Sequence, residues 1–449
     1  MTFLRTTLPL ALTMALLASG ARAGVDAAQA ERLKQDLTPF GAERAGNADG
    51  SIPPWEGGYT TPLPDPRTDP FAADKPLYQI NAQNMGEYAN QLSEGTRALL
   101  QKYPDSFHLD VYPTRRTASA PQWVYDNTYA NATRGQLEGD DVRGAFGGVP
   151  FPIPQSGTEV MWNHLLRWQG VALQRSPSQY QATANGKLVK ITDITSDYQY
   201  PFYYQDGSPE TFYDSGEFSK LRLLTRAPAI RAGDAIVGIE NLDQDKTQVW
   251  LYLTGQRRVR KLPNPCCDTP DPSTGGITSV DEAYGFFGRL DRYDWKLVGK
   301  QEMFIPYNNN RIFGAATDED VMAPHHVKPE YMRWEKHRVW VIDATLRAGK
   351  RHQAPRSRYY CDEDTWICTL GERWDGHGQL WKMTWVAPVV APDMPALLPA
   401  VFGAHDLLAE TAFISGINSR ASANPPFVVR ERQPDSVFTP DAMAGEGIR

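Results

Sequence analysis

The chain has 449 residues, of which 41% are hydrophobic and 22% charged, and its formal net charge at pH 7 is -7. This acidic balance argues against nucleic acid as a partner, because phosphate binding needs an excess of Lys and Arg. The length is ample for a large core and would allow more than one domain.

The first 23 residues have the features of a secretory signal peptide. Arg5 gives a positive start, Leu8 to Ala18 form an apolar run, and Ala21-Arg22-Ala23 is a small-residue cleavage signal. The apolar run is shorter than the roughly 20 residues that a transmembrane helix needs. The residue directly after the cleavage site is Gly24 and not Cys, which argues against a lipid anchor. We therefore expect export, cleavage after Ala23 and a soluble mature protein.

Residues 24–155 are expected to form an N-terminal arm and a helical region that pack on the body. A short helical pattern covers 27–37, and a run rich in Gly, Pro, Asn and Asp follows to about Pro76. A longer helix is predicted over 84–103, where apolar side chains recur at helical spacing.

The body is expected over 156–395. Two capping boxes, Ser156 to Glu159 and Ser279 to Glu282, predict amphipathic helices over 156–169 and 279–292. Strands are predicted over 180–184, 187–192, 221–225, 235–240, 248–253, 257–261, 295–304, 339–345, 358–360 and 378–385.

Strands joined by short turns indicate a mainly β protein with a mostly antiparallel sheet. About ten strands are many for an open sheet, so this one should curve or close, with the two helices on its concave side. Residues 396–449 are expected to be a C-terminal extension.

Aromatic residues are concentrated late in the chain, where six of the 12 tryptophans fall between Trp334 and Trp385. For each ring alone, a place in the core is the simpler explanation. Together they form a larger apolar surface than two helices would cover. We therefore expect a hydrophobic cavity lined or rimmed by Trp162, Trp250, Tyr252, Phe286, Trp340, Trp381 and Trp385.

Four cysteines allow three pairings. Cys361 and Cys368 flank a polar turn, and a hairpin in an oxidising compartment would bring their sulfur atoms together, so we predict this disulfide. Cys266 and Cys267 are neighbours, and whether they pair stays open. A metal site is the competing explanation for these cysteines, but the sequence contains no C-x-x-C motif that would support it.

No motif for catalysis, for a metal or for a cofactor is present: G-x-S-x-G, H-E-x-x-H and S-x-x-K are all missing from the sequence. Asp291 and Asp294 could be the carboxylate pair of a hydrolase, but solvated turn acids are the simpler explanation. We expect no enzymatic activity and no cofactor.

Six segments together resemble a proteobacterial family known as domain of unknown function thirteen twenty-nine, and the resemblance covers nearly the whole mature chain. The segments are Gly147 to Pro154, Glu159 to Leu165, Val249 to Leu253, Arg257 to Arg260, Tyr359 to Trp366 and Gly378 to Lys382.

That family is similar to periplasmic outer-membrane lipoprotein-sorting proteins of the LolA/LolB type. The resemblance implies an open β half-barrel with helices lidding a hydrophobic cavity. It also implies a periplasmic location, and work with a resistance-nodulation-division type inner-membrane transporter and an outer-membrane protein. It supplies no catalytic residues.

The leading hypothesis is thus a periplasmic carrier for a lipid or another hydrophobic small molecule. One alternative is a secreted hydrolase on a β scaffold, with Asp291 or Asp294 as general acid/base. Another is an envelope scaffold that binds no ligand. The space between the sheet and its covering segments distinguishes them, since it would be open, lined by carboxylates or filled.

Overall fold

The computed structural model describes residues 24–262 and 266–446, so the predicted signal peptide and its cleavage site lie outside the described residues. One mixed sheet of 17 strands forms most of the molecule, and few helices accompany it. The fold is therefore mainly β, as predicted. Among the described residues, no helix combines the length and apolar composition needed to cross a membrane.

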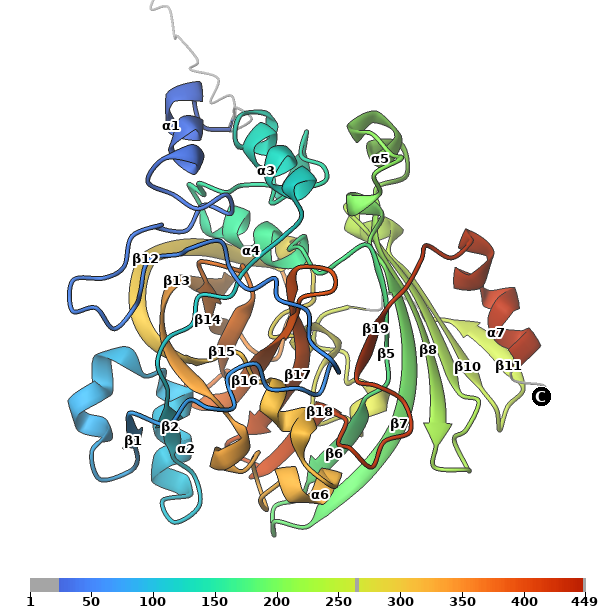
Figure 1. Ribbon diagram of the computed structural model, residues 1–449. Coiled ribbons are helices and arrows are strands. Elements are labelled where there is room, and N and C mark those ends of the chain that lie inside the picture. The colour runs from blue at the N-terminus through green and yellow to red at the C-terminus, as the bar shows by residue number, and fades with distance from the viewer. Residues whose placement is uncertain (1–23, 263–265, 447–449) are drawn as a thin grey trace, which may run out of the picture.

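The sheet has two parts, which Figure 1 shows on opposite sides of the view. One part is built from strands early in the body, paired antiparallel in the order β6-β7-β8-β9-β10-β11. Their bounds are β6 (Ser178–Ala182), β7 (Leu188–Gln199), β8 (Glu217–Ala227), β9 (Ala235–Asn241), β10 (Gln248–Leu253) and β11 (Arg258–Lys261).

The second part follows the order β12-β13-β14-β15-β16-β17-β18, again antiparallel. These strands are β12 (Tyr293–Pro306), β13 (Trp334–Leu346), β14 (Arg356–Asp362), β15 (Cys368–Trp374), β16 (Leu380–Ala391), β17 (Ala396–Asp406) and β18 (Thr411–Ile417). Because β18 pairs with β6, the two parts form one sheet. The segment 396–449, expected as an extension, thus supplies two internal strands.

Short strands complete this sheet. β5 (Ala172–Arg175) pairs with β7 and β19 (Phe427–Val429) with β5, while β1 (Tyr78–Ile80) pairs with β2 (Leu109–Val111). The sheet is mixed because β2 also pairs with β13 in parallel, at Val111 and Trp334. A separate hairpin joins β3 (Gln136–Glu138) to β4 (Asp141–Arg143).

The helices are short and lie mainly around the sheet (Figure 1). They are α1 (Ala27–Glu31), α2 (Glu94–Lys102), α3 (Gln122–Arg134), α4 (Gly157–Leu165), α5 (Pro209–Ser215), α6 (Asp318–Val321) and α7 (Pro440–Glu446). The helix predicted over 84–103 is split at Leu92 and Ser93, and Ser93 caps α2 through the backbone N–H of Thr96.

Helix α4 begins where its capping residue Ser156 predicts, but it is not an amphipathic lid. All its residues are buried, and it packs against β12 and β13. A Cβ atom on Gly157 would lie 2.7 Å from the carbonyl oxygen of Trp295, so glycine permits this close approach. The helix is therefore part of the core.

The helix predicted over 279–292 is wrong. The capping box of Ser279 and Glu282 is present, but it opens a single 3₁₀ turn, Val280–Glu282, and a second turn covers Leu290–Arg292. Between them Tyr284 and Gly285 have φ values of 54° and 88°, in the left-handed region that ends a helix. A Cβ on Gly285 would also lie 2.4 Å from the Cys368 carbonyl oxygen.

Two disulfides are present in the described chain. Cys361 pairs with Cys368 across the β14–β15 turn, as predicted, and Cys266 pairs with its neighbour Cys267. The second bond lies at the start of the segment 266–289, which is part of the connection between β11 and β12. This segment is called the covering segment below.

Candidate functional site

An apolar cavity of about 200 Å³ lies between the strands of the first part of the sheet and the covering segment. Its floor comes from alternate positions of three neighbouring strands, because side chains on a strand alternate between the two faces. These positions are Ser219, Leu221 and Leu223 of β8, Ile236, Gly238 and Glu240 of β9, and Val249 and Leu251 of β10. The cavity exceeds the roughly 150 Å³ that suffices to bind benzene in an apolar interior.

The covering segment forms the opposite wall. Val280, Ala283, Tyr284 and Phe287 line the cavity, and the left-handed bend at Tyr284 and Gly285 places these side chains on one side. The cover is therefore an irregular loop held by its own turns, in the place where the sequence predicted a helix.

A second hollow, a cleft of about 670 Å³, adjoins the cavity. Both are lined by Leu165, Glu240, Leu262, Val280 and Phe287. Trp162, Phe218 and Arg289 line the cleft alone. A molecule entering the cleft would thus pass the shared residues to reach the apolar cavity.

Glu240 lies at this junction and is half-buried. Its Oε2 accepts a hydrogen bond of 3.3 Å from the Thr247 hydroxyl. Burial raises the pKa of its carboxyl to about 7. The Glu240 carboxyl is therefore only partly ionised near neutral pH.

Several polar side chains also line the cavity, among them two arginines and three tyrosines. Arg167, Arg175, Tyr198, Tyr200 and Tyr284 line it. The hydroxyls of Tyr198 and Tyr284 are 2.6 Å apart and hydrogen-bonded. Burial raises the pKa of Tyr198 and of Tyr200 above the usual tyrosine range, so their hydroxyls keep their protons.

The predicted aromatic residues are not gathered at one place. Trp162 is buried, lines the cleft and donates from Nε1 to the Asp140 carbonyl oxygen at 2.7 Å. Trp250 and Tyr252 face away from the cavity, where they form a small second core with Phe438 and Met443.

Three of the other four lie in or beside the main core. Phe286 packs edge-on against Trp295 and Tyr359, and Trp340 is parallel to Trp366 at a centroid distance of 6.3 Å.

Trp385 is buried in the same core, and Trp381 lies at a separate hollow, where its Nε1 donates to Asp406 at 2.9 Å. Among the described residues that line the cavity or the cleft, Trp162 is the one that belongs to the seven predicted aromatic residues. Its contact with a ligand stays a prediction.

Asp291 and Asp294, the carboxylates of the hydrolase alternative, are held in ion pairs. Asp291 pairs with Arg289 and Lys350, and Asp294 with Arg347. Although burial opposes it, hydrogen bonds from Arg289 and Lys350 lower the pKa of Asp291 to about 2. Such a carboxyl is ionised near neutral pH and is poorly suited to act as a general acid.

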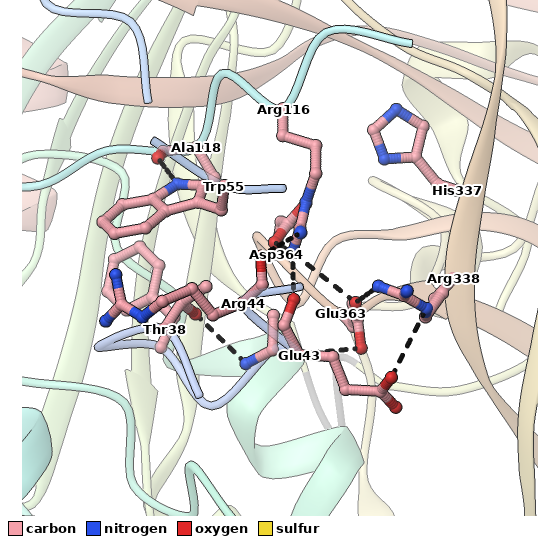
Figure 2. Close-up of polar contacts among 12 residues, drawn as sticks. Thr38, Glu43, Arg44, Trp55, Arg116, Ala118, His337, Arg338, Glu363 and Asp364 are labelled. Carbon is pink, nitrogen blue, oxygen red and sulfur yellow. Dashed lines mark hydrogen bonds and ion pairs between the residues drawn. The ribbon is translucent and has the colours of Figure 1, made fainter. Parts of the chain in front are cut away.

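A buried polar cluster joins the N-terminal region to the β14–β15 turn (Figure 2). Arg116 pairs with Asp364 at 2.7 Å and with Glu363 at 3.6 Å, and it donates to the Glu43 carbonyl oxygen. Arg338 pairs with Glu363 in the same cluster. These contacts fix the arm to the turn closed by Cys361 and Cys368.

His337, Asp362 and Asp364 lie close enough together to hold a metal ion. Most of their polar atoms have protein partners: Asp364 binds Arg116, His337 Nε2 contacts Glu335, and Asp362 Oδ2 accepts from Thr365. Asp362 Oδ1 is buried without a hydrogen-bond partner and lies 3.7 Å from His337 Nδ1. Contacts within the described part of the chain therefore occupy most of the ligand atoms that this cluster could offer to a metal.

Comparisons with known proteins identify relatives along nearly the whole chain. A family model described as "Protein of unknown function (DUF1329)" matches residues 79–444. The uncharacterized protein PA3922 of Pseudomonas aeruginosa is 35% identical over 450 residues, which cover 98% of this chain and 97% of that protein.

Solved structures are similar at low sequence identity. An outer-membrane lipoprotein-sorting protein domain from Vibrio parahaemolyticus matches with a TM-score of 0.44 and 10% identity, over 65% of this chain and 98% of that one. A DUF1329 family protein from Desulfovibrio piger gives 0.39 and 13%, over 61% and 92%. The LolA superfamily protein NE2245 from Nitrosomonas europaea gives 0.38 and 10%, over 64% and 100%.

Proposed function

This chain belongs to the DUF1329 family, and we propose that it is an exported carrier that binds a hydrophobic molecule between strands β8 to β10 and the covering segment. The observation that carries the proposal is the apolar cavity that adjoins a larger, more polar cleft. A carrier needs both features, since its cargo must be held away from water and must also leave.

The energetics of burial suit reversible binding. Each buried CH₂ group of a ligand contributes about 0.8 kcal/mol, so about ten groups give about 8 kcal/mol before ordering costs, or near-micromolar affinity. The cavity itself is about 200 Å³, so it would hold part of a long chain, and the adjoining cleft would take the rest. We infer one slender cargo molecule per protein.

Export and a periplasmic location are supported by the chain itself. The N-terminal 23 residues have the pattern of a secretory signal, and both cysteine pairs form disulfides, which persist in oxidising compartments. The proposal includes exchange of cargo with a membrane transporter of the resistance-nodulation-division type and with an outer-membrane protein, as the family resemblance implies.

The test is a titration of the purified mature protein with N-phenyl-1-naphthylamine, a neutral probe that becomes fluorescent in apolar sites. We expect saturable binding of one probe per protein and its displacement by long-chain amphiphiles. The same titration is repeated on the variant Gly238→Leu, whose added side chain extends into the cavity and should weaken binding. Absence of saturable binding, or equal binding by the variant, would contradict the proposal.

A further inference from the structure

Six arginines are buried among the residues that the structure describes. Four of them are paired with carboxylates: Arg116 with Asp364, Arg333 with Glu335, Arg338 with Glu363 and Arg373 with Asp281. The other two, Arg167 and Arg175, have no ion-pair partner within the described part of the chain, and both line the apolar cavity.

These two guanidinium groups are largely unsatisfied. Each side chain belongs to a residue that is 4% exposed. Nη1 of Arg167 donates to the His164 carbonyl oxygen, and Nη1 of Arg175 donates to the Pro399 carbonyl oxygen at 3.1 Å. The Nε–H groups of both are buried without an acceptor. A guanidinium has five N–H donors in a planar fork, so donors remain for a ligand.

The surroundings of the pair do not neutralise it. The rings of Tyr198 and Tyr284 lie 5.3 and 5.4 Å from the Arg175 guanidinium carbon, which gives cation–π attraction but no negative charge. Burial, together with the charge of nearby Arg175, lowers the pKa of Arg167 to about 10. Two unpaired cations in an apolar site are costly unless an anion joins them.

The two carboxyl groups at the cavity are committed elsewhere. Glu240 lies at the cleft and accepts from Thr247. Asp271 accepts from the backbone N–H and the hydroxyl of Ser273, at 2.8 and 2.7 Å. The site therefore has a cationic pole at the arginines and an acidic group at the mouth.

We propose that the cargo is a carboxylate amphiphile of the fatty-acid type, whose head accepts hydrogen bonds from Arg167 and Arg175. This rests on the proposed carrier function and specifies its ligand. The planar fork of arginine matches the two oxygens of a carboxylate, and the hydroxyl pair of Tyr198 and Tyr284 offers a further donor. The alkyl chain lies along Leu221, Leu223 and Val249 and continues into the cleft.

The experiment compares dodecanoate with dodecan-1-ol, which has the same chain and no charge, as competitors of N-phenyl-1-naphthylamine on the mature protein. We expect dodecanoate to bind about 10- to 100-fold more tightly, the range given by charge-assisted hydrogen bonds. Equal affinities would overturn the proposal and leave the carrier function standing. Failure of both to displace a bound probe, or of the probe to bind, would overturn both.

Variants assign the preference to the arginines. In Arg175→Gln, which keeps an N–H donor but removes the charge, the ratio of the two dissociation constants should fall at least about tenfold. The matched control is Arg358→Gln on β14, since Arg358 pairs with Asp343 away from the cavity. Circular dichroism checks that both Arg175→Gln and Arg167→Gln retain the fold. If they do, and the ratio of the two dissociation constants is unchanged in both, the assignment is contradicted.

Discussion

Replacing Gly238 by leucine should separate ligand binding from folding. Gly238 lies in the centre of β9, with Ile236 and Glu240 on the same face, and all three line the cavity. Its φ is not in the left-handed region, and an added Cβ would meet Val249 at 3.8 Å and Leu221 at 3.9 Å, which are ordinary contacts. A side chain can therefore extend from this position into the cavity without strain.

The expected magnitude follows from the carbon atoms that leucine adds. They displace about four methylene groups of the ligand, which at about 0.8 kcal/mol each costs about 3 kcal/mol, or about two orders of magnitude in affinity. The protein itself should become more stable, by about 1 kcal/mol, because the side chain fills empty space and glycine loses its extra freedom in the unfolded chain.

The assay is probe titration together with urea unfolding, for the mature protein, Gly238→Leu and Gly255→Leu. Gly255 lies in the exposed β10–β11 turn, where an added Cβ would meet no atom within 4 Å, so this control adds the same side chain on the surface. Unchanged affinity in Gly238→Leu, with a native unfolding transition, would refute the assignment of the cavity as the binding site.

Three further predictions concern stability. Because the pKa of Glu240 is raised to about 7 in the folded state, the free energy of unfolding should fall by about 3 kcal/mol as the pH rises from about 5 to about 8. In urea titrations Glu240→Gln should flatten this pH dependence, and an equal slope in the variant would contradict the burial of this carboxyl. Arg116→Met should lower the free energy of unfolding by about 3 kcal/mol, since it leaves Asp364 buried and unpaired. The control Arg32→Met breaks an exposed pair with Asp36 and should cost less than about 1 kcal/mol. Similar losses in the two variants would argue against the role of Arg116 in fixing the N-terminal arm. Replacing Cys361 and Cys368 together by serine should cost about 2 kcal/mol in chemical unfolding, the value for a short closed loop, and no loss would show that the bond is unimportant for the fold.

The strands were the most predictable part of the fold. Alternating apolar residues located β8 to β10, β12 and β13 within a few residues, and the predicted strand 248–253 coincides with β10. The sequence does not predict β17, because Pro388, Pro392, Pro395 and Pro399 suggest an irregular tail, and it leaves Phe413 to Gly416, within β18, open between strand and loop. Proline is tolerated there where the strands bulge, as the register shift between Ala387 and Val389 shows.

The candidate site could be predicted only in part. Alternation correctly grouped Trp250 with Tyr252, yet both faces of β10 are apolar, so the sequence did not decide which face met the cavity. The cavity wall instead uses Val249 and Leu251, and the aromatic face packs on α7 and the turn before it. Choosing between two apolar faces requires knowing what covers each one.

The arginine pair gave no local signal. Arg167 follows α4 and Arg175 lies in β5, and neither belongs to a sequence motif that predicts a binding site. Their unpaired state depends on residues far along the chain, since the Pro399 carbonyl oxygen and Tyr284 surround Arg175. The covering segment was likewise misread, because its capping box is real but the bend at Tyr284 and Gly285 ends the helix after one turn.

Native mass spectrometry of the mature protein, purified gently from the envelope of its own cells, tests the carrier function most directly. We predict a bound molecule at one per protein, removed by organic extraction, and absent from Gly238→Leu prepared in parallel. Identification of the extract should give a long-chain carboxylate. A bare protein mass for the wild type, before and after incubation with extracted envelope lipids, would contradict the central claim.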